Sequence, residues 1–130
     1  MILIAAVGPL GEIGNKNGLL WNLPNDMKFF RKITMGENVV MGYNTYQSLL
    51  NGKGILEGRH HYVLTSKQLE NTEQVTFVSH WNEVPKDAII CGGEKIYASA
   101  LELGLITECL LTMVRGFNGE YDRKIKLGDI

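Results

Sequence analysis

Cysteine and histidine are scarce in this sequence, which narrows the chemistry that it can support. The 130 residues include 2 cysteines, Cys91 and Cys109, each in an apolar run and without a C-x-x-C pair. This usage is typical of free thiols in a reducing compartment and argues against a disulfide scaffold. His60, His61 and His80 lack companion ligands at metal-like spacing, so we expect no metal site. We expect His60 and His61 to be strand residues.

An excess of one charge and long apolar stretches are also missing. The 13 basic and 14 acidic residues are scattered and give a net charge of −1, and no basic block marks a nucleic-acid binder. No stretch approaches the length of a membrane span, and the apolar residues 1–7 lack the basic region that precedes a secretory signal. We therefore expect a cytoplasmic protein without nucleic-acid or membrane partners.

The composition that remains suits one cored domain. The chain is 45% hydrophobic, and its length favours a single domain, residues 1–130. Short apolar runs alternate with helical segments, which predicts a three-layer α/β fold with a mostly parallel central sheet. The expected strands lie at residues 1–7, 39–41, 61–64, 75–78, 88–91 and 108–114.

Glycines are concentrated in residues 8–20. Gly8, Gly11, Gly14 and Gly18 are too frequent for a helix, and their spacing is not the G-x-G-x-x-G dinucleotide fingerprint. We interpret this stretch as a mobile lid, hinged by glycines, that could close over a bound ring and exclude water.

Asp26 occupies an unusual place in the helix that is expected after residue 22. Its neighbours at i+3, i+4 and i+7 are Phe29, Phe30 and Ile33, so the carboxylate lies on the apolar stripe of the helix. An acid in such a place shifts its pKa, finds an interior partner or meets a ligand. One interpretation is a favourable charge in the first helical turn. The other is a carboxylate that recognises the cationic edge of a flat ligand.

A strand that ends in glycine and leads into a helix occurs twice. The apolar run at 39–41 ends at Gly42, before a helix expected from Asn44 or Thr45, and the run at 88–91 ends at Gly92 and Gly93. Free backbone N–H groups and the helix dipole make such junctions suitable for phosphate. The alternative is that the glycines only permit tight turns.

An ordered set of motifs resembles the dihydrofolate reductase family. The set comprises Ile4-Ala5-Ala6, Ile13-Gly14, Trp21-Asn22-Leu23-Pro24 with Asp26, Met41-Gly42, Thr45, Gly58-Arg59 and Gly92-Gly93-x-x-Ile96-Tyr97. The match extends to about Thr112. The resemblance implies an NADPH-dependent oxidoreductase of one-carbon metabolism, open to antifolate inhibition. It would reduce 7,8-dihydrofolate to tetrahydrofolate by hydride transfer to C6 and protonation at N5.

The resemblance also implies the roles of individual residues. Asp26 would bind the pterin, Trp21 would order a water and Thr112 would hydrogen-bond the carboxylate. Arg59, which composition alone would place at a solvated edge, would clamp the α-carboxylate of the glutamyl tail. The substrate set comprises Ile4, Ala5, Met27, Phe30, Leu49, Arg59 and Cys91. The cofactor set comprises Ala6, Ile13, Gly14, Asn17, Leu19, Gly42, Tyr43, Asn44, Thr45, Leu64, Thr65, Ser66, Gly92, Gly93, Glu94, Lys95, Ile96 and Tyr97.

Two departures from the family pattern bear on the cofactor and on the edge of the sheet. In the family, the glycine that corresponds to Gly42 is commonly followed by a basic residue, but here Tyr43 and Asn44 follow it. Ser66, Lys67 and Lys95 could therefore supply substitute contacts to the 2′-phosphate of NADPH. Beyond Val114, the two closing antiparallel strands of the family are expected to be missing. The strand at 108–114 would then be an open edge, covered by residues 121–127 or paired in a homodimer.

Two other functions remain open at this point. A reductase of riboflavin biosynthesis shares the fold, although the Asp26 and Arg59 matches argue against it. A non-catalytic structural or ligand-binding protein is the other alternative, because the closing strands are expected to be missing.

Overall fold

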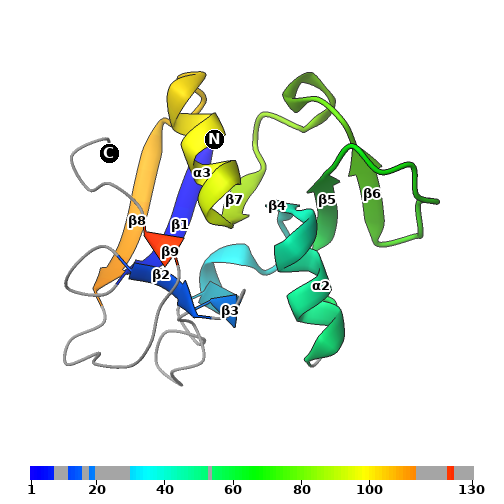
Figure 1. Ribbon diagram of the computed structural model, residues 1–130, viewed down its shortest axis with the longest axis horizontal. Helices are drawn as coiled ribbons and strands as arrows, with labels where there is room; N and C mark the ends of the chain where they lie inside the picture. Colours follow the sequence, from blue (N-terminus) through cyan, green and yellow to red (C-terminus); the bar gives the residue numbers. More distant parts are fainter. Residues whose placement is uncertain (8–11, 16–17, 20–29, 53, 114–122, 125–130) are drawn as a thin grey trace.

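A six-stranded sheet forms the centre of the protein (Figure 1). The computed structural model describes residues 1–7, 12–15, 18–19, 30–52, 54–113 and 123–124. The sheet has the strand order β6-β5-β4-β7-β1-β8. Every described strand pair in it is parallel, which confirms the predicted mostly parallel sheet. Its strands are β1 (Ile2–Val7), β4 (Asn38–Gly42), β5 (His60–Leu64), β6 (Val75–Val78), β7 (Ile89–Gly92) and β8 (Glu108–Met113).

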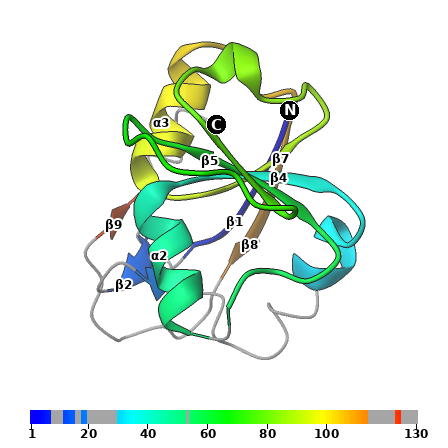
Figure 2. The ribbon, with the colours of Figure 1, turned by 90° about the vertical axis from the view of Figure 1, so that its right-hand side faces the viewer.

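Helices cover both faces of the sheet and complete the three layers. One face carries α3 (Glu94–Glu102) and the 3₁₀ helix η2 (Trp81–Glu83), and the other carries α2 (Tyr43–Asn51) and the helical residues 30–34. In Figure 2, α3 lies above strands β4 and β5 and α2 lies below them. No helix in the described part of the chain is long and apolar enough to cross a membrane.

Each face of the sheet has its own apolar core. The α3-side core consists of Leu3, Ala5, Val40, Val78, Val84, Ala88, Ile90, Ile96, Tyr97 and Ala100. The α2-side core consists of Ile4, Phe30, Val39, Met41, Val63, Val75, Ile89 and Cys91, with Tyr43, Tyr46 and Leu49 packed against it. Central parallel strands are buried on both faces, which explains why β7 is buried at all four positions and why these strands are continuous apolar runs.

The topology brings the two strand-glycine-helix junctions together. Strands β4 and β7 are adjacent and parallel, and Met41 pairs with Gly92 at their carboxyl ends. Helix α2 begins directly after Gly42, and α3 begins directly after Gly93. The N-termini of both helices therefore lie close together, at the carboxyl ends of two neighbouring strands.

Residues 8–20 were predicted to be a loop, but part of this stretch belongs to a second, small sheet. Strands β2 (Glu12–Asn15), β3 (Gly18–Leu19) and β9 (Arg123–Lys124) form it in the order β3-β2-β9, with antiparallel pairing. It lies beside the carboxyl end of β1 (Figure 1). Gly14 pairs with Leu19 and Asn15 with Gly18, so glycine and asparagine mark a hairpin here. The remainder of the expected lid lies outside the described residues.

The carboxyl-terminal prediction is tested only in part. Arg123 and Lys124 pair with β2 of the small sheet, so these two residues do not cover β8. Residues 114–122 and 125–130 lie outside the described part of the chain, and the missing closing strands stay a prediction.

His61 joins the loop before β5 to the beginning of β6. The side chain is fully buried; its Nε2 accepts a hydrogen bond from the Leu56 N–H at 3.0 Å, and its Nδ1 is 3.0 Å from the Gln74 carbonyl oxygen. A carbonyl only accepts, so Nδ1 carries the proton and the ring is neutral. Burial lowers the pKa of His61, and the nearby His60 and Arg59 lower it further, while the Gln74 hydrogen bond opposes them.

Acid is expected to destabilise the fold through His61. Its pKa is lowered in the folded state, so the unfolded chain takes up the proton first. The free energy of unfolding therefore falls as pH drops below the ordinary histidine pKa of about 6.5, at up to about 1.4 kcal/mol per pH unit. Urea unfolding between pH 7.5 and 5 measures this slope, and His61→Asn should flatten it. Equal slopes in the two proteins would show that His61 is not the titrating group.

Candidate active site

A pocket of about 310 Å³ lies at the carboxyl ends of β4 and β7. Its walls come from the β4–α2 junction and the β7–α3 junction, together with Leu64 at the end of β5 and Ser66. We call it the glycine pocket. All of its lining residues belong to the predicted cofactor set: Gly42, Tyr43, Asn44, Thr45, Leu64, Ser66, Gly93, Glu94, Lys95 and Ile96.

The two helix N-termini make the glycine pocket suitable for phosphate groups. Gly42 and Gly93 are the N-cap residues of α2 and α3, and no side chain caps either helix, so the N–H groups of both first turns are open to an anion. A Cβ atom on Gly42 would lie 2.9 Å from Ile96 Cγ1, and one on Gly93 would lie 3.4 Å from Thr45 Oγ1. Glycine at position 42 therefore lets the β4–α2 junction approach Ile96 of α3 closely, whereas a Cβ atom on Gly93 would make only an ordinary contact.

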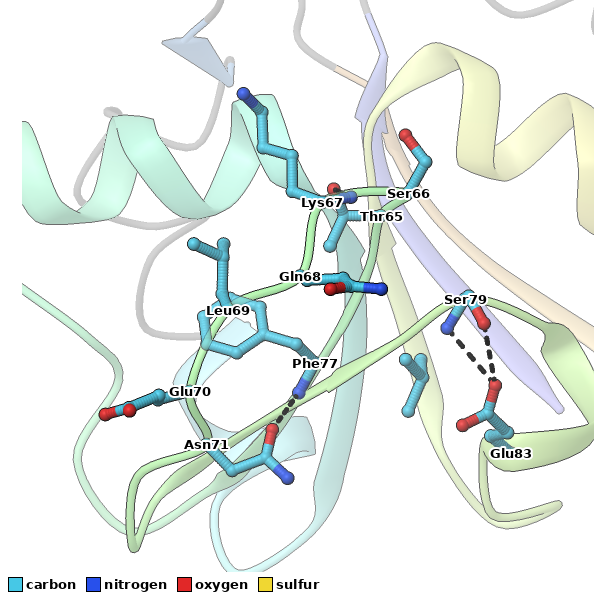
Figure 3. Close-up of a pocket in the computed structure, with 11 residues that line it drawn as sticks. Thr65, Ser66, Lys67, Gln68, Leu69, Glu70, Asn71, Phe77, Ser79 and Glu83 are labelled. Atoms are coloured by element: carbon cyan, nitrogen blue, oxygen red, sulfur yellow. Dashed lines mark hydrogen bonds between the residues drawn. The ribbon is translucent and has the colours of Figure 1, made fainter.

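A second pocket of about 490 Å³ adjoins the first, and Ser66 lines both. We call it the loop pocket (Figure 3). The loop after β5 forms one wall, and β6 with its following residues forms the other. Its lining residues are Thr65, Ser66, Lys67, Gln68, Leu69, Glu70, Asn71, Phe77, Val78, Ser79 and Glu83. Thr65, also of the predicted cofactor set, is therefore placed in the loop pocket.

Arg59 is held against the carboxyl end of the helical residues 30–34. Its side chain is 7% exposed. Nε donates to Thr34 Oγ1 at 3.1 Å, one terminal nitrogen donates to the Glu57 carbonyl at 2.7 Å, and the other donates to the Arg31 carbonyl at 3.5 Å. Gly58, with φ +78°, allows the turn that delivers Arg59. The structure therefore places this arginine in the interior of the fold, and the solvated-edge alternative is wrong.

The fixed guanidinium retains donors for a ligand. Arginine has five N–H groups, and the three hydrogen bonds above use one on each nitrogen. Among the described residues, one N–H of each terminal nitrogen has no partner beyond these three hydrogen bonds, and two such groups can bind a carboxylate. Burial lowers the pKa of Arg59, and the neighbouring Arg31 lowers it further, but an arginine remains protonated at neutral pH.

Most of the described substrate set lies on one face of the sheet. Ile4, Phe30 and Cys91 belong to the α2-side core, and Leu49 packs against it. Burial raises the pKa of the Cys91 thiol, which keeps it neutral and apolar in character. Ala5 is the exception, because its side chain lies in the α3-side core. Any contact between Ala5 and a ligand on the α2 side would come from its backbone.

Tyr97 links α3 to β1. The side chain is 1% exposed, and its hydroxyl donates to the Ile4 carbonyl at 2.8 Å. Burial raises the pKa of Tyr97, so the hydroxyl stays protonated and can donate. The same hydrogen bond fixes the backbone of β1 beside Ile4, which belongs to the predicted substrate set.

Replacing Tyr97 by phenylalanine is expected to lower the free energy of unfolding by about 1–3 kcal/mol, because the buried Ile4 carbonyl loses its donor. Urea denaturation measures the change. Tyr62→Phe is a matched control in a half-buried tyrosine of β5. If the two variants were equally stable, the Tyr97 hydroxyl would not stabilise the fold.

Several predicted residues are described only in part or not at all. Ala6, Ile13, Gly14, Leu19 and Thr112 are placed by their backbone, and Ala6 pairs with Thr112 across β1 and β8. Asn17, Trp21, Asp26 and Met27 lie outside the described residues. Gly92, the last residue of β7, is buried and has φ +135°, a conformation that favours glycine.

The sequence reasoning missed Thr34 as a partner of Arg59. Thr34 is fully buried, and its hydroxyl donates to the Phe30 carbonyl at 2.8 Å while accepting from Arg59. In the sequence, the one indication that Thr34 faces the interior is its position four residues after Phe30, on the same face of the helix. Its link to Arg59, 25 positions away in the chain, has no local signature.

Comparisons with known proteins are consistent with this arrangement. The family model described as Dihydrofolate reductase matches residues 1–122. A dihydrofolate reductase of Enterococcus faecium is 40% identical over 100 residues, which cover 70% of this chain but only 58% of that protein. A dihydrofolate reductase of Mycobacterium leprae is 34% identical over 125 residues, which cover 86% of this chain and 70% of that protein.

A solved structure has a similar fold. It is the dihydrofolate reductase from Enterococcus faecalis complexed with NADP(H) and RAB-propyl, with a TM-score of 0.76 and 28% sequence identity. The match covers 92% of this chain and 74% of that chain.

Proposed function

Because the chain belongs to the dihydrofolate reductase family, whose model matches residues 1–122, we propose that it reduces 7,8-dihydrofolate to 5,6,7,8-tetrahydrofolate with NADPH. One observation carries the proposal: every residue that lines the glycine pocket belongs to the cofactor set implied by the sequence motifs. We further propose that residues 1–130 act as one reductase domain.

NADPH is proposed to bind across the glycine pocket. It would supply the hydride that reaches C6 of the substrate. The first-turn N–H groups of α2 and α3 would bind the diphosphate, because both helix N-termini are uncapped by side chains. Thr45, whose side chain is buried between the two junctions, would add a hydroxyl. These groups would fix the position of the reactive ring relative to the substrate.

Dihydrofolate is proposed to bind on the α2 side of the sheet. Ile4, Phe30, Leu49 and Cys91 would supply an apolar wall, together with Met27. Arg59 would bind the α-carboxylate of the glutamyl tail through the two N–H groups that have no partner among the described residues. An apolar wall and a fixed guanidinium together suit a long, flat ligand with an anionic end.

Asp26 is proposed to promote protonation at N5. Its carboxylate would bind the 2-amino group and N3 of the pterin, and its negative charge would favour the protonated ring. Trp21 would order the water that delivers the proton, and Thr112 would hydrogen-bond the carboxylate. The support is the position of Asp26 on the apolar stripe of its predicted helix.

The first test is the loss of NADPH absorbance when dihydrofolate is added to the purified chain. We expect turnover that a folate-analogue inhibitor abolishes. Turnover with the pyrimidine substrate of the riboflavin-pathway reductase, in place of dihydrofolate, would favour that enzyme. Saturable binding of both ligands without turnover would favour a non-catalytic protein.

The proposal also concerns the cellular compartment of the protein and its binding partners. We infer a cytoplasmic enzyme whose partners are small molecules. Strand β8 is at one end of the described strand order, which is the basis for a homodimer paired through that edge. Light scattering at micromolar concentration would give the mass of the particle.

A further inference from the structure

His61 is one hydrogen bond away from the turn that carries Arg59. Its Nε2 accepts from the Leu56 N–H at 3.0 Å. The next residue, Glu57, accepts from a terminal nitrogen of Arg59 through its carbonyl oxygen at 2.7 Å. Because Leu56 and Glu57 are consecutive, the hydrogen bond to His61 helps to fix the acceptor that orients the guanidinium.

The ring of His61 is anchored in the central sheet, whereas residues 54–58 form a loop. His61 pairs in register with Val39 of β4 and with Val75 of β6, and its side chain is fully buried. Its Nδ1 donates to the Gln74 carbonyl at 3.0 Å, which sets the orientation of the ring. The anchored ring therefore holds the loop, and the loop in turn presents the carbonyl that the guanidinium uses.

The hydrogen bond between His61 and Leu56 requires an uncharged ring. Nδ1 already carries the proton that it donates to Gln74, so Nε2 is the one ring atom that could take a second proton. A protonated Nε2 would present an N–H to the Leu56 N–H, and two donors cannot hydrogen-bond to each other. Because a buried donor without a partner is costly, the charged ring is expected to displace the loop.

The charges around His61 also favour the uncharged ring. Arg59 and His60 oppose a second positive charge there, although burial is the largest cause of the lowered pKa of His61. Helix α2, on the same face of the sheet, contains no charged residue. The charged residues of the neighbouring segments have exposed side chains: Arg31, Lys32, Glu37, Glu57 and Glu73. A carboxylate bound at Arg59 would offset the charge of that arginine, but it would leave the larger effect of burial in place.

We propose that uncharged His61 is a positioning residue: through residues 56–57 it holds Arg59 in the orientation that binds the anionic tail of the substrate, and protonation of its ring releases this hold. The inference rests on the proposed function, because it needs the α-carboxylate of the tail at Arg59. The other two nitrogens of the guanidinium keep their acceptors on the helical residues 30–34, so loss of the third contact should misalign the arginine. His61 thus sets the selectivity for substrates with an anionic tail and leaves the chemistry at the pterin unchanged.

The first test compares kcat and KM of the full chain for dihydrofolate and for a dihydropteridine without the glutamyl tail. His61→Leu removes the acceptor and is expected to raise KM for dihydrofolate by about 10-fold, the effect of about one hydrogen bond. Neither kcat nor the KM of the tailless substrate should change. His61→Gln should restore most of the affinity, because its side-chain oxygen can reach the place of Nε2 and accept from Leu56. A merely destabilised fold would instead lower kcat for both substrates.

His60→Gln is the matched control. His60 precedes His61 in β5, so its side chain lies on the opposite face of the sheet, where its Nε2 is 2.7 Å from Thr76 Oγ1. This variant should leave the KM of both substrates unchanged. A rise in KM for dihydrofolate alone in His60→Gln, of the same size as in His61→Leu, would contradict the proposed path through Leu56.

The second test uses pH and needs no His61 variant that might fail to fold. In the wild-type protein, the KM ratio of tailless to tailed substrate should be constant above the ordinary histidine pKa of about 6.5 and fall below it. The pKa of His61 is lowered while the loop is in place, so acid favours the displaced loop, by at most about tenfold per pH unit because one proton is involved. His61→Gln has no titrating ring, and its ratio should stay level.

The outcomes separate this inference from the proposed function. A ratio that rises in acid would show that the charged ring acts as a second cation for the tail, and it would overturn the inference. Parallel pH profiles in wild type and His61→Gln would also overturn it. If Arg59→Leu abolished the preference for the tail while His61→Leu kept it, this inference alone would fail. Wild-type protein that neither binds nor reduces dihydrofolate would refute the proposed function.

Discussion

Replacing Asp26 by asparagine is expected to lower kcat for dihydrofolate at neutral pH by on the order of 100- to 10,000-fold, the range for loss of a proton-transfer group. Asparagine has nearly the same shape and can still hydrogen-bond to the pterin, but it lacks the charge that favours protonation at N5. The deficit should shrink as the pH is lowered, because the solvent then protonates a larger fraction of the bound substrate. Steady-state rates between pH 5 and 9, with saturating NADPH, measure both effects.

A matched control for this variant is Asp87→Asn. The Asp87 side chain is exposed and accepts a hydrogen bond from Asn38 Nδ2 at 3.3 Å, which an asparagine oxygen can also accept. It should keep the wild-type rate at every pH. A near-normal rate for Asp26→Asn at pH 7 would remove Asp26 from the proton transfer.

Replacing Arg59 by leucine is expected to weaken dihydrofolate binding by about 100-fold or more, equivalent to about 2.7 kcal/mol or more. The α-carboxylate of the substrate would lose both of its donors, and each charge-assisted hydrogen bond contributes about 1.5–3 kcal/mol. A dihydropteridine substrate without the glutamyl tail should lose little affinity. The ratio of the two KM values for each variant therefore isolates the contribution of the tail.

Arg59 also supports the fold, since it donates to Thr34, Glu57 and Arg31, so Arg59→Leu could unfold. Arg59→Lys keeps a cation without the planar pair of donors and should give an intermediate loss for the tailed substrate alone. Lys32→Leu, an exposed position on the same helical segment, is the control. Equal losses for tailed and tailless substrates would show that Arg59 does not bind the carboxylate.

The central sheet was predictable because its strands leave a strong sequence signal. Strands β4 and β7 are buried on both faces, so each is a continuous apolar run that ends in glycine. The glycines then mark the beginnings of α2 and α3. Their closeness in space follows from the adjacency of β4 and β7 in the sheet, which the local sequence does not indicate.

Other features could not be predicted because they depend on distant pairing. The β2–β3 hairpin lies in a glycine-rich stretch with no apolar alternation, and β9 joins it from the other end of the chain. The hydrogen bonds from Arg59 to Thr34 and to Arg31 link residues more than 20 positions apart. Such contacts are set by the fold, whereas composition alone predicts a solvated edge for Arg59.

Transfer of deuterium is the most direct test of the proposed reaction. NADPH that carries deuterium at both C4 positions is incubated with dihydrofolate and the purified chain, and the tetrahydrofolate formed is examined by mass spectrometry and proton NMR. Direct hydride transfer predicts one deuterium per product molecule, at C6, and none at N5 after exchange with water. Product without deuterium at C6, or NADPH bound without any product, would contradict the assignment of this chain as a dihydrofolate-reducing enzyme.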